Sequence, residues 1–393
     1  MEITQQHKPQ LAELVRQYGF NASLVWWMIE ENATTTGWPP PLMVEPLVKD
    51  QREKVKELND LGLRASPYMG YSAVGAPSAL ATQFGNEWSR RPLSTIPAEP
   101  PKGHYMWDSC GNSGFADYMA AGTQWVLDDL GFQGCYTDGL AQVYSCQNTH
   151  HGCGYYDEQG NLRATWPVFA TREMLKRMYK QIHARHTDGY LTNHVSYNTI
   201  IPTMSFTDVY YTGEHEQYED LLKFRVRWQG KQWGIWPILL GGDCHCYESL
   251  HVTYALLHGV SVWPQGFIGR NDVLRKTANL WQAYDRFGYR QAKWIPYYRS
   301  EEVRAKSDND NVKVSLYLRK GKSTIPTALG KAMLIVGNLA HEVVNCKVNL
   351  NLKSMGLKGK SATNALDGRS LPLQGSTLSV RVRPASFVLV EVE

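Results

Sequence analysis

The sequence lacks several features that would assign it to a familiar class. Its 393 residues contain no run of about 18 apolar residues, so we expect no membrane-spanning helix and no membrane partner. Basic residues number 41 against 37 acidic ones, without a dense basic stripe, so the sequence does not predict a nucleic-acid partner. No G-x-G-x-x-G follows a predicted strand, and Walker-type loops and G-x-S-x-G elbows are missing. We therefore predict no nucleotide cofactor.

Two further absences concern export and cross-linking. The first residues, MEITQQHKPQ, lack the charged-then-apolar pattern of a signal peptide. We expect either a cytoplasmic protein or a periplasmic or secreted one whose signal has been removed. Seven cysteines in a chain of this length are an odd number, which is not the pattern of a disulfide scaffold.

Aromatic residues, in contrast, are abundant. The chain has 13 Trp and 22 Tyr, and many of them lie in predicted loops beside Gly, Pro, Asn or His. For any single ring, packing in the core is the simpler interpretation. Their recurrence in many loops, however, favours a sugar-binding surface. Flat apolar rings beside polar groups suit sugars, which have an apolar face and a rim of hydroxyls.

Strands and helices are predicted to alternate over the first 300 residues, which favours a parallel sheet. Seven strands can be counted, whereas a (β/α)8 barrel needs eight. We number them two to eight and expect either that strand one lies upstream of Met1 or that another segment closes the barrel. The predicted strands are 23–29, 63–69, 132–137, 189–194, 206–211, 234–240 and 259–263. The predicted helices are 6–18, 47–61, 114–130, 168–185, 247–258 and 272–287. Residues 70–112 are predicted as a long loop with a small hairpin.

The pattern changes near residue 296. Short alternating runs such as KVSLYLRKG and SFVLVEVE, split by Gly, Asn, Asp and Lys, predict an antiparallel β-sandwich of seven or eight strands. We therefore expect two domains, an α/β barrel over residues 1–295 and a C-terminal β-sandwich over 296–393.

In an α/β barrel, chemistry takes place at the carboxyl ends of the strands. Asp138 ends the strand over 132–137, while Asp208 and Glu214 belong to the region of strand 206–211. A pair of carboxylates around one barrel mouth is what glycoside hydrolysis requires. Simpler interpretations stay open: a turn residue before Gly139, a core acid at Asp208 and a solvated loop acid at Glu214. Tyr68, at another strand end, is also polar. The predicted substrate-binding residues are Trp107, Asp108, His151, Arg163, His194, Tyr211, Asp243 and Trp263.

The loop after Asp138 contains a group of potential metal ligands, Cys146, His150, His151 and Cys153. Zinc is one interpretation, although C-x6-C is not a usual spacing for it. A Cys146–Cys153 disulfide is a second, and loop packing or substrate contact is the third and simplest. The sequence prediction therefore assigns no metal.

Three segments resemble bacterial glycoside hydrolase barrel proteins of uncharacterised type: GFQGCYTDGL, HHGCGYYDEQGNLRATWPVFATRE and SFTDVYYTGEHEQ. They are more distantly similar to the α-galactosidase-like clan, families 27, 31 and 36, and to family 123. The clan resemblance implies a nucleophile at Asp138 and an acid/base at Glu214 or Asp208. The clan usually has Lys two residues before the nucleophile, where this chain has Tyr136. Family 123 uses an adjacent Asp-Glu pair, and the obvious pair here is Asp157-Glu158.

Together, these observations predict a glycoside hydrolase acting on an oligo- or polysaccharide, with no cofactor. Two alternatives stay open. One is a carbohydrate-binding barrel without catalysis, and the other is a metal-dependent hydrolase that uses the cysteine and histidine loop.

Overall fold

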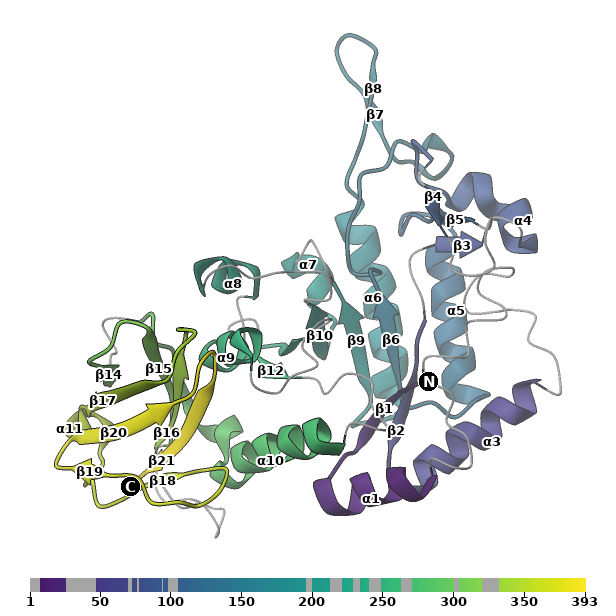
Figure 1. Cartoon of the computed structure of the whole chain (residues 1–393). Coiled ribbons are helices and arrows are strands. Elements are labelled where there is room, and N and C mark those ends of the chain that lie inside the picture. Colours follow the sequence, from purple (N-terminus) through teal and green to yellow (C-terminus); the bar gives the residue numbers. More distant parts are fainter. Residues whose placement is uncertain are drawn as a thin grey trace. The chain divides into compact units, whose positions relative to one another are not determined.

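The computed structural model describes most of the chain, in two compact units over residues 1–212 and 213–393 (Figure 1). The described residues are 8–25, 47–69, 73–75, 78–93, 95–97, 105–195, 200–212, 221–228, 234–239, 249–262, 271–299, 304–319 and 332–393. Within these ranges, none of the helices has the length and apolar character needed to cross a membrane.

Parallel strands form the centre of the first unit. Strand β1 (Ala22–Val25) pairs with β2 (Arg64–Pro67), and β9 (Tyr190–His194) pairs with both β6 (Gly134–Asp138) and β10 (Val209–Thr212). A parallel bridge between Tyr68 and Tyr136 connects the end of β2 to β6. Each of these strands lies where the sequence predicts one. Short, largely apolar runs suit such strands because a parallel sheet is covered on both faces.

Helices alternate with these strands, as predicted. Apolar residues at helical spacing explain why these segments form helices with one buried face. In α5 (Phe115–Asp128), Phe115, Met119 and Val126 are fully buried on that face. Helix α6 (Val168–Arg185) buries Met174, Leu175, Met178 and Ile182 in the same way. Further helices of this unit include α1 (Lys8–Tyr18), α3 (Leu47–Asp60) and the short α7 (Ile201–Met204).

The region predicted as a long loop contains more structure than expected. Strands β3 (Ala73–Gly75), β5 (Tyr105–Asp108) and β4 (Thr95–Pro97) form a small antiparallel sheet in that order. Helix α4 (Ala79–Trp88) was not predicted, although Ser78 caps it by accepting a hydrogen bond from the Ala81 amide. Two of its three buried residues, Ala81 and Gly85, are small, and with Trp88 as the single bulky one its apolar face gives no clear periodic signal.

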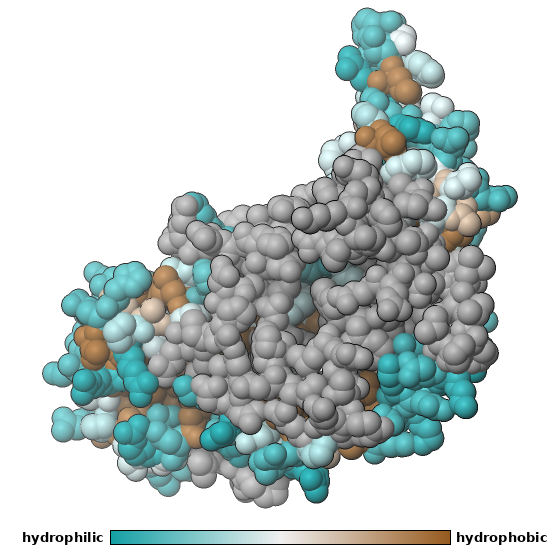
Figure 2. All heavy atoms as spheres, turned by 45° about the vertical axis from the view of Figure 1, so that its right-hand side comes forward, coloured by the Kyte–Doolittle hydropathy of each residue, from teal (hydrophilic) through white to brown (hydrophobic). Residues whose placement is uncertain are grey.

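A narrow hairpin projects from the same unit. It consists of β7 (Tyr155–Tyr156) and β8 (Leu162–Arg163), and it follows the 3₁₀ turn η2 (Thr149–His151). In Figure 1 it stands at the end of the unit where α5 and α6 begin, which is the end where β6 and β9 finish. Figure 2 shows the projection as largely hydrophilic.

The second unit begins with α/β elements and ends with antiparallel sheets. Its parallel pair is β11 (Trp236–Leu239) with β12 (Ser261–Val262), both at predicted positions. The helices around this pair are α8 (Leu221–Trp228), α9 (Leu250–Leu257) and α10 (Asn271–Phe287), followed by η4 (Tyr289–Gln291). The antiparallel strands begin with β13 (Lys293–Ile295). The predicted domain boundary after residue 295 stays a prediction.

Two antiparallel sheets make up the rest of the second unit. The five-stranded sheet has the order β13-β15-β16-β21-β18, and the four-stranded sheet has the order β14-β17-β20-β19. Alternation in the sequence explains β17, where every second residue is buried in the core that both sheets share. The remaining strands are β14 (Ala305–Ser307), β15 (Val312–Leu318), β16 (Ala332–Asn338), β17 (Val344–Leu350), β18 (Ala362–Asn364), β19 (Leu373–Gln374), β20 (Thr377–Val382) and β21 (Phe387–Val392). A one-turn helix, α11 (Leu352–Met355), follows β17.

Close strand packing at Gly134 gives a test of the parallel sheet. A Cβ atom there would lie 2.5 Å from the carbonyl oxygen of Tyr190 and 2.8 Å from the hydroxyl of Ser66. Gly134→Ala should therefore lower the free energy of unfolding by about 2 to 3 kcal/mol, the upper part of the overpacking range, since a backbone carbonyl cannot move aside cheaply. Urea denaturation measures this. As a control, Gly160→Ala has open space around the new methyl group and should cost only the strain of its positive φ, about 1 kcal/mol. Equal losses in the two variants would contradict the packing argument.

Candidate active site

Asp138 lies at the carboxyl end of β6, level with His194 of the neighbouring strand. Only 7% of its surface is exposed. One carboxylate oxygen accepts a hydrogen bond from the Tyr68 hydroxyl at 2.8 Å, and the other lies 3.1 Å from Nδ1 of His194. Gly139 follows with φ +67°, which lets the chain turn away directly after the carboxylate. Asp138 is thus more than a turn residue, because three strands fix the position of its carboxylate.

Aromatic rings surround this carboxylate. Tyr136 stacks on Tyr68 with ring centres 5.4 Å apart, and it meets Tyr211 edge-on at 5.8 Å. The ring of His194 lies 5.6 Å from that of Tyr211. The predicted residues Asp138, His194 and Tyr211 therefore share one site. Tyr68 and Tyr136 join them, and the position of Tyr68 at a strand end was the sequence signal for it.

A separate polar network holds the strands in register behind the carboxylate. The Thr137 hydroxyl donates to the side-chain oxygen of Asn193, whose amide donates in turn to the hydroxyl of Thr207 at 2.6 Å. Thr137 and Asn193 are fully buried and precede Asp138 and His194 by one residue. Because successive strand residues point to opposite faces, this network lies on the other face of the sheet and braces the site from behind.

Asp208 lies at the other end of its strand. It precedes β10, and its backbone amide donates to the carbonyl of Leu191, three residues before His194. Three strand residues span about 10 Å, so Asp208 lies near the amino ends of the strands, away from Asp138. Its carboxylate accepts from the Leu191 amide at 2.8 Å and lies 3.0 Å from Nε2 of His183. These contacts give it a structural role, and we do not keep it among the catalytic candidates.

Arg163 and the adjacent acidic pair lie in the projecting hairpin. Asp157 accepts from the backbone amide of Asn161 at 2.8 Å and from Arg163 Nε at 2.7 Å. The amide of Asn161 and the Arg163 guanidinium hold the pKa of Asp157 below its usual value. Glu158 beside it is exposed. These residues shape the turn of the hairpin, and Arg163 is engaged there and not at the Asp138 site.

Trp107 and Asp108, two further predicted binders, have packing partners of their own. The ring of Trp107 fills the space beside Gly85 of α4, where a Cβ atom would lie 2.5 Å from it. Asp108 is buried and forms an ion pair with Arg90, whose guanidinium carbon lies 4.4 Å from the centre of the Tyr144 ring. Both residues therefore support the loops around β5.

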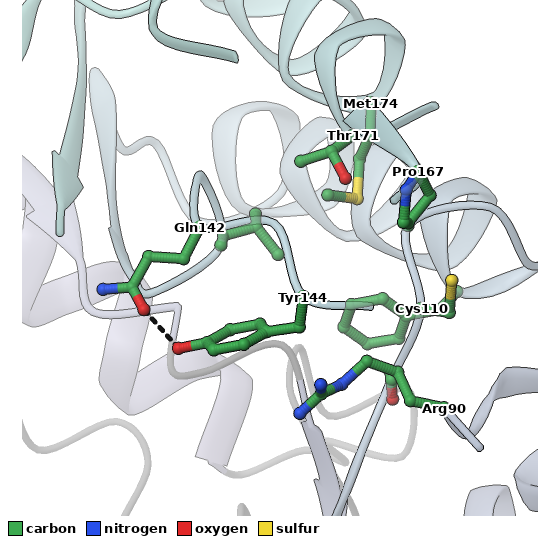
Figure 3. Close-up of a pocket in the computed structure, with 11 residues that line it drawn as sticks. Arg90, Cys110, Gln142, Tyr144, Pro167, Thr171 and Met174 are labelled. Atoms are coloured by element: carbon green, nitrogen blue, oxygen red, sulfur yellow. Dashed lines mark hydrogen bonds between the residues drawn. The ribbon is translucent and has the colours of Figure 1, made fainter. Parts of the chain in front are cut away.

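A small cavity lies beside that ion pair. Figure 3 shows Arg90, Tyr144 and Gln142 on one side of it and Thr171 and Met174 of α6 on the other. Its volume is about 20 Å³. This is room for roughly one water molecule, which excludes a sugar ring from this cavity.

His151 lies in a cluster of sulfur atoms. Its Nε2 lies 3.3 Å from the sulfur of Cys146, and the sulfurs of Cys110 and Cys153 are 3.8 Å apart. Hydrogen bonding with the Cys110 thiol has the largest effect on the pKa of the Cys146 thiol and lowers it. Hydrogen bonding with His151 lowers this pKa further, whereas burial raises it. The hydrogen bond between the two cysteines raises the pKa of the Cys110 thiol. All of the cysteines in the cluster are free thiols, so the Cys146–Cys153 disulfide, one of the interpretations that the sequence left open, is not formed.

Three of the predicted site residues, Glu214, Asp243 and Trp263, lie outside the described residues. Glu214 follows the end of β10 by two positions, and β10 is the strand next to β9. The structure thus brings together Asp138, His194 and Tyr211 from the predicted set. It places Asp208, Arg163, His151, Trp107 and Asp108 in other environments.

Comparisons with known proteins agree with this architecture. Residues 276–367 match the family model "Glycoside hydrolase 123, C-terminal domain". No match was found among curated proteins. A GH27 β-L-arabinopyranosidase from Geobacillus stearothermophilus is a similar structure, with TM-score 0.60 and 13% identity over 100% of this chain and 93% of its own.

Two other solved structures are similar at the same level. A maltogenic α-amylase from Thermotoga neapolitana has TM-score 0.58 and 12% identity over 99% of this chain and 94% of its own. The GH36 α-galactosidase AgaA from Geobacillus stearothermophilus has TM-score 0.58 and 11% identity over 98% of this chain and 53% of its own. These likenesses establish the fold, which is the parallel α/β core of TIM-barrel glycosidases followed by antiparallel sheets. The predicted fold class is confirmed.

The contacts of Asp208 predict a role in stability. Asp208→Ala should lower the free energy of unfolding by about 1 to 3 kcal/mol, because the Leu191 amide loses its acceptor and His183 its carboxylate. Chemical denaturation followed by circular dichroism measures the change. Glu158→Ala, an acidic truncation in the exposed hairpin, should stay within about 0.5 kcal/mol of the wild type. A loss at Asp208 no larger than that of the control would refute the structural role.

Proposed function

We propose that this protein is a glycoside hydrolase whose active site is built around Asp138. The observation that carries the proposal is a mostly buried carboxylate at the carboxyl end of a parallel strand, held by Tyr68 and adjacent to His194. The match of residues 276–367 to a glycoside hydrolase domain and the glycosidase-type fold support it. Carbohydrate is accordingly the proposed substrate class.

In this proposal Asp138 acts as nucleophile or general base. The Tyr68 hydroxyl donates to one of its oxygens and stabilises the negative charge that either role needs. The same bond fixes the orientation of the carboxylate, so little is lost in aligning it with an anomeric carbon. His194, level with Asp138 on β9, faces the other oxygen and is placed to contact a sugar hydroxyl.

Glu214 is the proposed general acid/base. It comes two residues after β10 ends at Thr212. In an α/β barrel the residues that follow the carboxyl ends of the strands carry the chemistry, and Glu214 follows one such end in the sequence. In the sequence, Asp243 comes four residues after the end of β11 and Trp263 directly after β12, and both stay proposed substrate contacts. The separation of the two carboxyl groups, about 5–5.5 Å or 6.5–9.5 Å, would decide retention or inversion.

The rings around Asp138 support a sugar as substrate. Tyr68, Tyr136 and Tyr211 present aromatic faces and edges beside a carboxylate and an imidazole. Such a surface matches a pyranose ring, which combines an apolar face with hydroxyls at its edge. Tyr136 occupies the position where the α-galactosidase-like clan usually has Lys. Tyr136 stacks on Tyr68, so an aromatic surface lies next to the proposed nucleophile of this chain, where the clan usually has a lysine side chain.

The adjacent pair Asp157-Glu158 is the other arrangement that family resemblance suggested. Asp157 uses its carboxylate to close the hairpin turn through Asn161 and Arg163, and Glu158 is exposed beside it. This engagement favours Asp138 over the adjacent pair as the nucleophile or general base of the chain.

Asp138→Asn should abolish hydrolysis, with kcat/KM reduced about 100-fold or more, because an amide can neither attack nor accept a proton. An aryl-glycoside screen would first supply a substrate, and circular dichroism would verify the fold of the variant. Glu158→Gln is the matched control and should retain wild-type kcat/KM. The reverse pattern, loss at Glu158 and retention at Asp138, would assign the chemistry to the adjacent pair.

Glu214→Gln should affect substrates according to their leaving groups. Activated aryl glycosides need little protonation and should be hydrolysed within a few-fold of the wild-type rate, whereas natural glycosides should lose about 100-fold or more. Steady-state kinetics on both classes measure this, with sugar binding followed in parallel. Equal loss on both classes would exclude Glu214 as the acid. Sugar binding by the wild type without turnover of any glycoside would overturn the proposed hydrolase in favour of a carbohydrate-binding barrel.

A further inference from the structure

Four potential metal ligands converge in the first unit, outside the proposed active site. The sulfurs of Cys110, Cys146 and Cys153 and a ring nitrogen of His151 all lie within 4.8 Å of one another. They come from two separate segments. Cys110 follows β5, and the other three belong to the long loop between β6 and α6. From the sequence, His150 was expected beside the other three loop residues, but in the structure the fourth ligand is Cys110, which is 36 positions before Cys146.

The spacing of these atoms fits tetrahedral zinc. With Zn–S near 2.3 Å and Zn–N near 2.0–2.1 Å, a tetrahedron places two sulfurs about 3.8 Å apart and a sulfur and nitrogen about 3.6 Å apart. The observed distances are 3.8 Å between the Cys110 and Cys153 sulfurs and 3.3 Å between the Cys146 sulfur and His151 Nε2. The other four pairs of ligand atoms lie within 4.8 Å, so shifts of about 1 Å or less would close the tetrahedron around an ion.

The surroundings of the ligands are those of a metal site. Nδ1 of His151 faces the backbone carbonyl of Glu87, which fixes the proton on Nδ1 and leaves Nε2 as the ligand atom. The backbone amide of Asn112 donates to the Cys110 sulfur, and that of Asn148 donates to the Cys146 sulfur, each at 3.4 Å. Amide hydrogen bonds of this kind stabilise thiolates and orient them toward a cation.

Burial strengthens the case. Cys110, Cys146 and Cys153 are each no more than 2% exposed and form a compact group by themselves. Three thiols cannot all form disulfides with one another, so pairing any two of them leaves the third without a partner in the cluster. A single divalent ion would use all three together with the imidazole.

We propose that Cys110, Cys146, His151 and Cys153 bind one structural Zn²⁺ ion. On binding, each of the three thiols releases its proton to solvent and the imidazole binds in its neutral form, so no oxidant or reductant is needed. Four protein ligands complete the tetrahedron and leave no position for water or substrate. The site is therefore structural, and the metal-dependent hydrolase considered from the sequence is not the function that it supports.

The ion would join two loops near the proposed active site. Residues 139–167 begin directly after Asp138, and they contact the segment around α4 through Asn148, whose side chain donates to the carbonyls of Asn86 and Ser89 at 2.8 and 2.7 Å. Zinc would add a link from this loop to Cys110, just ahead of α5. The long loop would then be anchored at its base, beneath the β7–β8 hairpin (Figure 1).

Metal analysis of the full chain, purified without a histidine tag, tests the proposal. Elemental analysis should find about one zinc per chain, retained through dialysis and released by a thiol-modifying mercurial. Less than a tenth of an equivalent of zinc after growth in zinc-supplemented medium would overturn it. So would stoichiometric iron, or a disulfide within the cluster detected by non-reducing peptide mapping.

Adjacent histidines provide a matched pair of variants. His151→Ala should weaken zinc binding at least tenfold in competition with a chromogenic chelator, whereas His150→Ala, an exposed neighbour, should bind as the wild type does. Equal affinity in the two variants would overturn the assignment.

A measurement on the wild-type chain keeps the test valid if the His151 variant does not fold. Cobalt substituted for zinc should give the intense visible bands of tetrahedral coordination and a thiolate charge-transfer band in the near ultraviolet. Weak octahedral bands would overturn the site. None of these measurements uses enzymatic activity. They can therefore refute the zinc site without affecting the proposed hydrolase, and the activity assays can refute the hydrolase without affecting the zinc site.

Discussion

The parallel pairing of β6 with β9 is the interaction on which the proposed active site depends. Five consecutive residue pairs, from Gly134 with Tyr190 to Asp138 with His194, fix the relative height of the two strands. A slip of one residue would turn Asp138 to the opposite face, where Thr137 and Asn193 now form their buried network. The register is enforced from both faces, by that network on one and by the stacked rings on the other.

Gly134 shows how tight this pairing is. Its missing side chain leaves room for the carbonyl of Tyr190 and the hydroxyl of Ser66, at the start of the strand that ends in Asp138. The close approach brings β2 beside β6, and the bridge between Tyr68 and Tyr136 follows from it. Tyr68 can then reach the Asp138 carboxylate. A small residue at one end of a strand thus sets the hydrogen bonding at the other end.

The loops after the strands present a different physical problem. Residues 139–167 form a connection much longer than the 12–15 residues at which irregular loops become uncommon in compact domains. Its base is held by the bridge between Cys146 and Thr165, by Asn148 and by the sulfur cluster, while the hairpin beyond it is closed by Asp157. The cysteines therefore stabilise the loops. The Asp138 carboxylate and the aromatic rings, in contrast, belong to the site that the strands build.

Local patterns in the sequence were sufficient for much of the fold. Helices such as α6 and strands such as β6 were predicted within a few residues, because bulky apolar side chains recur with the period of the element. Helix α4 was missed since its buried face uses small residues. Asp208 was assigned to the site because it lies near a strand, although the hydrogen bond between its amide and Leu191 puts it at the amino end.

The sequence by itself therefore determined the alternation of strands and helices, the change to antiparallel strands and the position of Asp138 at a strand end. Only the tertiary structure decided which distant residues meet there. Tyr68 is 70 positions before Asp138, and Cys110 is 43 positions before Cys153. Periodicity reports which face of its own element a residue occupies, whereas a pairing between elements depends on register, strand order and the paths of loops. That physical difference explains why the carboxylate was found from the sequence, while the pairing of Tyr68 with it and the fourth ligand of the cluster were found only in the fold.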